Sequence, residues 1–293
     1  MTPTDLLSRL WHDYTQLTPQ AARIHALLAA RGEVICNDHV ALRTFDRAGL
    51  GLDAMARPFE ALGWQRRDRY RFDDKHLWAA YWQHADPALP KVFISELVVD
   101  ELSPTLIALV DRLIAQLPPG FADRDDLALA GRPWSLDHAT YRALLAESEY
   151  AAWVAAFGWR VNHFTVDVGR LTTFDDLTGV NTFLTERGFE LNTAGGVVKG
   201  TPADHLEQSS TRADAVTVAF ADGEHEVPSC YYEFARRYPL PSGERFEGFV
   251  PTSANRLFES TDVKRPAERS EAVQGPDEIG TVTLDGADRS TGG

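Results

Sequence analysis

The chain has 293 residues, of which 44% are hydrophobic and 10% aromatic, enough apolar material to give one large domain or two modest ones a real core. This composition excludes a disordered chain. Lysine and arginine total 29 against 43 aspartate and glutamate residues, which gives a formal charge of −14. Because such an acidic surface repels nucleic acids and anionic membranes, neither is an expected partner.

The cysteines and the N-terminal residues bear on the compartment. Cys36 and Cys230 are too few for a disulfide framework, and a reducing interior explains them most simply, although one structural bridge stays open. The first residues lack the basic segment and the unbroken apolar core of a signal peptide. No apolar run reaches the length of about 18 residues that indicates a membrane span. We therefore expect a cytoplasmic location.

The first third of the chain predicts a helical cap and then a β-module. Residues 1–32 predict two helices, because Leu6, Leu10 and Tyr14 repeat at helical spacing and a second helix follows Pro19. Residues 33–100 predict a β-α-β-β-β module, which begins with the strand-like segment VICNDHVALRTF and continues through a helix and three further strands. This alternation is typical of an α+β fold.

The rest of the chain predicts a helical insertion, a second module and a tail. Residues 101–158 contain two long amphipathic helical stretches and predict an insertion. Residues 159–265 resemble the first module: WRVNHFTVDV is followed by a helix, and the strands VTVAFADGEHEVP and SCYYEFARRYP complete it, with Asp222-Gly223 as a hairpin turn. Residues 266–293 are polar without apolar periodicity, which predicts a flexible tail.

Each predicted module places a histidine in an Asn-containing, strand-like segment. His39 lies in NDHVALR and His163 in VNHFTV. If the modules pack as pseudo-symmetric halves, their first strands are neighbours and the two histidines can converge. Glu233, in CYYEFARRYP, would then complete a triad of two imidazoles and one carboxylate, which leaves open coordination positions and suits Fe(II).

Simpler interpretations stay open at this point. A lone histidine on a strand is more often structural than a ligand, and the chain has nine histidines. His76 could line the same cavity, and His205 could contact substrate. Glu233 could merely pair with Arg236 or Arg237, although a carboxylate on an apolar strand is costly without a partner.

Five motifs in order resemble the 2-oxoadipate dioxygenase/decarboxylase family, also called the hydroxyglutarate synthase family. They are NDHVALRTF, VNHFTV, LEQSST, YYEFARRYP and FVPTSANRLFEST, and the match spans about residues 30–261. The resemblance implies a fold similar to the vicinal-oxygen-chelate superfamily and a mononuclear Fe(II) centre. Carried over by motif, the metal ligands fall on His39, His163 and Glu233, and a substrate-binding arginine falls on Arg43.

The family's Pro-x-Ser-Ala segment lies near the substrate, which makes Thr252 and Ser253 further substrate-binding candidates; a turn with satisfied hydroxyls is the alternative. Gln208, Ser209 and Ser210 rank lower, because helix capping would explain them equally well. We also expect aromatic walls around the cavity, from Phe45, Trp78, Phe164, Tyr231 and Phe249.

Arg43 also fits the pattern physically. Residues 39 and 43 point to the same face of a strand, roughly 13 Å apart at about 3.3 Å per residue, so both side chains can reach one cavity. A guanidinium there can bind a substrate carboxylate as a bidentate fork, and a structural pairing with Asp38 or Asp46 is the alternative.

The reaction implied by the resemblance is the O2-dependent conversion of 2-oxoadipate, or a similar 2-oxo dicarboxylic acid, into 2-hydroxyglutarate and CO2, a step of lysine catabolism. The substrate itself supplies the reducing electrons. Two other functions stay open: a metal-dependent isomerase or lyase of similar fold, and a non-catalytic metalloprotein that binds a small acid.

Overall fold

The computed structural model describes residues 1–47 and 49–251. Within this part the helices and strands follow the predicted order along the chain. The α-helices are α1 (Pro3–Leu17), α2 (Pro19–Ala30), α3 (Leu52–Glu60), α4 (Pro104–Ile114), α5 (His138–Glu147), α6 (Glu149–Phe157) and α7 (Leu177–Thr185). The strands are β1 (Asn37–Phe45), β2 (Gln65–Phe72), β3 (Leu77–Gln83), β4 (Lys91–Leu97), β5 (Val161–Asp167), β6 (Lys199–Thr201), β7 (Leu206–Ser210), β8 (Ala215–Phe220), β9 (Gly223–Pro228) and β10 (Glu233–Arg237).

Eight strands form one sheet in the order β2-β3-β4-β1-β5-β10-β7-β6. Read outward from the centre, β1-β4-β3-β2 on one side matches β5-β10-β7-β6 on the other, and in each half the two innermost strands are parallel. β1 and β5 meet antiparallel at the centre, with Ala41 opposite His163. This arrangement confirms the predicted α+β fold of two pseudo-symmetric β-modules whose first strands are neighbours.

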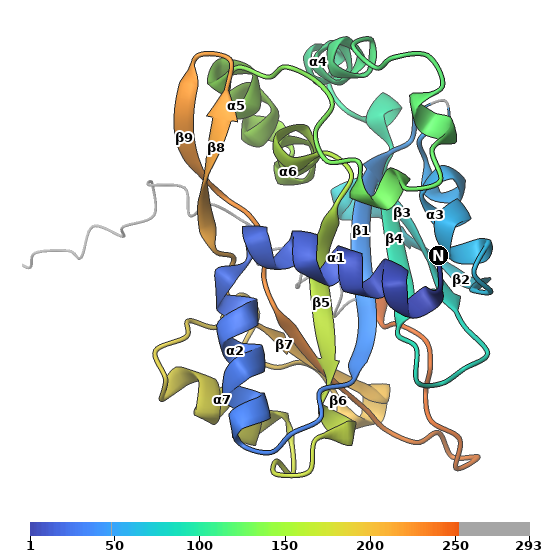
Figure 1. Cartoon of the computed structure of the whole chain (residues 1–293), viewed down its shortest axis with the longest axis vertical. Coiled ribbons are helices and arrows are strands. Elements are labelled where there is room, and N and C mark those ends of the chain that lie inside the picture. Colours follow the sequence, from blue (N-terminus) through green and yellow to red (C-terminus); the bar gives the residue numbers. More distant parts are fainter. Residues whose placement is uncertain (48, 252–293) are drawn as a thin grey trace, which may run out of the picture. The chain divides into compact units, whose positions relative to one another are not determined.

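Helix α1 packs against β5 and covers one face of the sheet centre (Figure 1). It begins with a capping box, in which the Thr2 hydroxyl accepts from the Asp5 amide and the Asp5 carboxylate accepts from the Thr2 amide. On its buried face, the Tyr14 ring lies 5.3 Å from the Phe164 ring. Since successive strand residues point to opposite faces, His163 projects away from α1. The cap thus seals one face, and the histidine lies on the other.

The predicted helical insertion differs from expectation in its second half. Instead of one long amphipathic helix, residues 136–158 form α5 and α6, which are separated at Ser148. The Ser148 hydroxyl accepts from the Ala151 amide and so caps α6. From Tyr150 to Phe157 every residue of α6 is buried, because this helix is enclosed rather than amphipathic.

The second module also differs from the prediction, because β8 and β9 do not join the large sheet. They form a separate two-stranded hairpin near α5, and only the later strand β10 enters the sheet (Figure 1). Phe220 pairs with Gly223, so the turn is Ala221-Asp222 rather than Asp222-Gly223. Among the described residues, no helix is both long enough and apolar enough to cross a bilayer.

Candidate functional site

Three side chains from adjacent central strands converge on one point. His39 lies on β1, His163 on β5 and Glu233 on β10, and their candidate ligand atoms all lie within 4.8 Å of one another. The Nε2 atom of His39 lies 3.5 Å from Glu233 Oε1, and that of His163 lies 3.3 Å from Glu233 Oε2. The strand register explains this convergence, because Thr165 of β5 pairs with both His39 and Glu233. The structure therefore brings together the three residues that the sequence singled out.

The residue before each histidine orients its imidazole. Asp38 Oδ1 lies 2.8 Å from Nδ1 of His39, and Asn162 Oδ1 lies 2.9 Å from Nδ1 of His163. An acceptor at Nδ1 favours the tautomer that carries its proton there, which leaves the Nε2 lone pair facing Glu233. Two lone pairs and a carboxylate then share one small space. Such a set of acceptors is stabilised by a cation, so these residues fit a metal ion.

The protonation of the site agrees with a metal-binding role. Burial, followed by the electrostatic effect of the neighbouring His39 and Arg43 side chains, holds the pKa of His163 well below its ordinary value. Its imidazole is therefore neutral at pH 7, which is the form that binds metals. Burial raises the pKa of Glu233, while His39 and a hydrogen bond from Gln208 oppose that rise.

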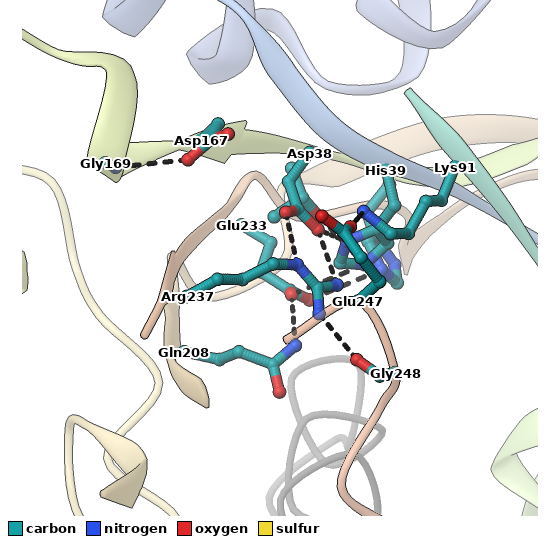
Figure 2. A network of polar contacts seen from close by, with 12 residues as sticks. Asp38, His39, Lys91, Asp167, Gly169, Gln208, Glu233, Arg237, Glu247 and Gly248 are labelled. Atoms are coloured by element: carbon teal, nitrogen blue, oxygen red, sulfur yellow. Dashed lines mark hydrogen bonds and ion pairs between the residues drawn. The ribbon is translucent and has the colours of Figure 1, made fainter. Parts of the chain in front are cut away.

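Asp38 belongs to a buried ionic network behind His39. Arg237 grips it with two hydrogen bonds, from Nε to Oδ2 at 2.6 Å and from Nη2 to Oδ1 at 2.9 Å, as Figure 2 shows. Burial alone would raise the pKa of Asp38, but Arg237, the hydrogen bond with His39 and the charge of Lys91 hold it well below its ordinary range. Asp38 is therefore ionised and keeps its acceptor on His39.

A cavity opens on the face of the site that bears the three converging side chains. Besides these three, its described lining residues are Ala41, Leu42, Arg43, Phe93, Ser95, Asn162, Gln208, Tyr231 and Phe249. Gln208 Nε2 donates to Glu233 Oε1 at 2.7 Å. Among the described residues, Gln208 Oε1 and Asn162 Nδ2 are buried without a hydrogen-bond partner. A donor and an acceptor thus remain for a polar ligand.

Arg43 lines this cavity, and its partner differs from both alternatives considered above. Its Nη1 atom lies 3.2 Å from Glu149 Oε1, rather than on Asp38 or Asp46. The guanidinium carbon lies 5.0 Å from the centre of the Tyr150 ring and 5.2 Å from that of Trp153. The charge of Arg43 is therefore held in a fixed, aromatic setting at the cavity wall.

Several other sequence-based candidates lie elsewhere. His76 sits in a left-handed turn with 43% of its side chain exposed, and it pairs with Glu101. His205 occupies a similar left-handed turn before β7, and neither is among the described residues that line the cavity. The alternative pairing of Glu233 with Arg236 or Arg237 is not what its described contacts show.

The aromatic walls were predicted in part. Tyr231 and Phe249 line the cavity, together with Phe93, which the sequence did not single out. Of the described lining residues, none is Phe45, Trp78 or Phe164, which point into other parts of the core or its edge. Gln208, Ser209 and Ser210 lie on β7, and none of them caps one of the described helices. Thr252 and Ser253 lie outside the described residues.

The sequence reasoning missed the roles of Asp38, Asn162 and Arg237. A signal for the first two was present, because each histidine is preceded directly by a residue with a side-chain oxygen acceptor. Arg237 gave no comparable signal, since its partner lies 199 positions away along the chain.

Comparisons with known proteins relate this chain to others in sequence and fold. The family model of 2-oxoadipate dioxygenase/decarboxylase matches residues 5–116 and 126–246. A chloroplastic/amyloplastic 2-oxoadipate dioxygenase/decarboxylase of Oryza sativa subsp. japonica is 33% identical over 291 residues, which covers 90% of this chain and 80% of that protein.

Solved structures give the same result. Hydroxyglutarate synthase of Oryza sativa in complex with 2-oxoadipate superposes with a TM-score of 0.84 at 33% identity, covering 88% of this chain and 91% of that one. A protein of Shewanella frigidimarina NCIMB 400, described as a hydrolase, has a TM-score of 0.81 at 50% identity, covering 85% and 98%. A glyoxalase superfamily protein of Ralstonia eutropha JMP134 has a TM-score of 0.67 at 24% identity, covering 83% of this chain and 84% of that one. This similarity concerns the fold alone.

The paired modules and the residues that converge between them define an α+β protein with a candidate single-metal site. Within that class, the extent of the family match and the identity to the rice protein decide the family. The chain belongs to the 2-oxoadipate dioxygenase/decarboxylase family.

Proposed function

We propose that the protein is an Fe(II)-dependent dioxygenase that converts 2-oxoadipate and O2 into 2-hydroxyglutarate and CO2. The family membership and the likeness to a hydroxyglutarate synthase that binds 2-oxoadipate support this reaction. The atoms balance without another reductant, because the keto acid loses its carboxyl group as CO2 and provides the electrons that reduce O2. A related 2-oxo dicarboxylic acid would follow the same course.

His39, His163 and Glu233 are the proposed iron ligands. The observation that carries the proposal is their convergence within 4.8 Å, with both Nε2 lone pairs facing the same carboxylate. Two imidazoles and one carboxylate would hold the ion and leave open coordination positions for a keto acid and O2. When bound, Fe(II) would supply the one-electron chemistry that allows O2 to react with a closed-shell organic acid.

The chain's own residues would bind and orient the substrate. Arg43 has the charge and planar geometry to hold a substrate carboxylate, while Glu149 holds the guanidinium through its Nη1 atom. Asn162 Nδ2 offers a donor in the same cavity. The rings of Phe93 and Phe249 exclude water from the reacting atoms. Thr252 and Ser253 remain proposed substrate contacts from the family motif.

Metal analysis and anaerobic reconstitution test this proposal. The expected results are one iron per chain, and O2 uptake matched by CO2 release when 2-oxoadipate is added to the Fe(II)-loaded protein. His39→Ala, His163→Ala and Glu233→Ala should each abolish metal retention and turnover. His12→Ala, on the exposed side of α1, is the matched control and should change neither.

The rival functions predict different results. Turnover of the acid in the absence of O2 would favour an isomerase or lyase. Stoichiometric metal and acid binding without any turnover would favour a binding protein. Arg43→Ala should keep iron but lose substrate affinity, whereas full iron retention by both histidine variants would show that the ligands are misassigned.

The cytoplasmic location and the division at residues 32, 100, 158 and 265 belong to the proposal as well. Cell fractionation tests the location. Limited proteolysis tests the last of these boundaries, because the sequence predicts cleavage confined to residues 266–293, which lie outside the described residues.

A further inference from the structure

A short strap after β10, defined as residues 246–249, covers the candidate metal site. The ring of Phe249 packs edge-on against the His39 imidazole at 4.9 Å between centroids. It also lies 4.8 Å from Phe93 and 5.3 Å from Tyr81. One side chain of the strap therefore touches both a candidate metal ligand and the cavity wall.

Arg237 joins this strap to the residue that orients His39. Its Nε and Nη2 atoms hold Asp38, while its remaining Nη1 atom donates to the carbonyl of Gly248 at 2.5 Å (Figure 2). The same Nη1 atom also donates to the carbonyl of Phe246 at 3.3 Å. The Arg237 guanidinium also lies over the Phe249 ring, 5.0 Å from its centroid. One buried, planar group thus serves two partners from separate parts of the chain.

Two further contacts hold the strap without touching the Asp38 carboxylate. The amide of Phe249 donates to Tyr70 Oη at 3.1 Å, and Glu247 forms an ion pair with Lys91. These contacts provide an internal comparison. Tyr70 holds the strap but makes no hydrogen bond to Asp38, whereas Arg237 holds both the strap and the Asp38–His39 pair.

We propose that Arg237 is a positioning residue that couples closure of the strap to the aim of His39 at the metal. The inference rests on the proposed iron site. When the strap carbonyls hold Nη1, the plane of the guanidinium is fixed, and so are both oxygens of Asp38. Asp38 then fixes the imidazole through Nδ1, which aims Nε2 at the ion. When the strap opens, the guanidinium is no longer fixed, and the contacts from Arg237 to Asp38 and from Asp38 to His39 become less rigid.

A lysine at position 237 cannot perform this coupling. Its ammonium keeps the positive charge beside Asp38, but all its donors sit on one nitrogen atom. The arginine guanidinium instead reaches Asp38 through Nε and Nη2 and the strap through Nη1. Arg237→Lys therefore preserves charge while it removes the link. Outer contacts of this kind typically change metal affinity by about 10–100-fold.

Hydrogen exchange of the full-length protein, with and without Fe(II) under anaerobic conditions, tests the coupling. In the wild type, Fe(II) should slow amide exchange in the peptide that contains residues 246–249. In Arg237→Lys, Fe(II) should no longer slow amide exchange in the strap. Because coupling is reciprocal, this variant should also bind Fe(II) more weakly, by a factor similar to the slowing seen in the wild type. Tyr70→Phe is the matched control: its strap should exchange faster, yet still respond to Fe(II) with nearly unchanged affinity.

The outcomes separate this inference from the proposed function. If the wild type binds one Fe(II) at the three ligands but strap exchange does not change, the coupling is wrong and the iron site stands. The same conclusion follows if Arg237→Lys responds to Fe(II) as fully as the wild type. If the wild type holds no iron at these ligands, both fail. The wild-type measurement alone can overturn the coupling should the variant not fold.

Discussion

Replacing Asn162 by leucine should weaken metal binding by about 10–100-fold without removing any ligand. In the native structure, Asn162 Oδ1 accepts from Nδ1 of His163, and burial excludes water from this contact. Leucine has a similar shape but no acceptor. The imidazole must then either leave its Nδ1–H unpaired or move the proton to Nε2, where it would occupy the lone pair that the metal needs.

Two estimates of the size of this effect agree. Leaving one buried donor without an acceptor costs about 1–3 kcal/mol. A 10–100-fold loss of affinity corresponds to about 1.4–2.8 kcal/mol, at 1.4 kcal/mol for each factor of ten. The other amide atom, Nδ2, has no described partner, so its removal adds little to this cost.

Competition with a chelator of known affinity measures the loss, and thermal unfolding without metal measures the stability of the fold. Asn162→Asp is the control, because a carboxylate keeps the acceptor and should retain metal within about threefold. It should nevertheless weaken binding of a dicarboxylate, since Asn162 lines the cavity and a new negative charge there repels the substrate. Metal affinity equal to wild type in Asn162→Leu would refute the orienting role.

Three further results concern stability. Removing bound metal from protein saturated at 100 times its dissociation constant should cost about 2.7 kcal/mol, visible as a lower melting temperature. Tyr14→Phe should cost about 1–3 kcal/mol in urea unfolding, because Tyr14 Oη donates to the buried carbonyl of Tyr231 at 2.5 Å; an unchanged midpoint would contradict this. Burial raises the pKa of Glu33, but hydrogen bonds from the hydroxyls and amides of Thr173 and Thr172 outweigh it and lower the pKa. The stabilisation is therefore complete above the unfolded pKa of about 4.3 and is lost as the pH falls through the lower folded value. Glu33→Gln should be destabilising at pH 7, and the difference from wild type should shrink as the pH falls below about 4.3.

The order of the elements was predictable because local patterns encode it. The spacing of Leu6, Leu10 and Tyr14 appears in the structure as the buried face of α1. The partner of a strand is not encoded in the same way. Residues 215–220 alternate between more and less exposed side chains, as in a strand with one buried face. This alternation does not say which strand pairs with it, and here the partner is β9 instead of a strand of the large sheet.

The candidate ligands were predicted mainly from the family motifs, and the repeated histidine segment gives a physical reason for two of them. The repeated histidine motif marks corresponding positions in two similar modules, and the symmetry of the sheet then places His39 and His163 on neighbouring strands. Contacts that break this symmetry left no sequence signal. Glu149 reaches Arg43 from the inserted helices, 106 positions along the chain, and only the packing of α6 brings it there.

The same symmetry breaks at the residues that orient the histidines, where one module has Asp38 and the other Asn162. Asn162 lines the substrate cavity, so its neutral amide orients His163 without repelling a dicarboxylate. Asp38 lies behind His39, where two hydrogen bonds from Arg237 neutralise its charge. A carboxylate is the stronger acceptor and raises the basicity of its imidazole more than an amide does. Each module therefore has the strongest acceptor that its surroundings permit: a paired carboxylate away from the cavity, and an amide where the substrate must bind.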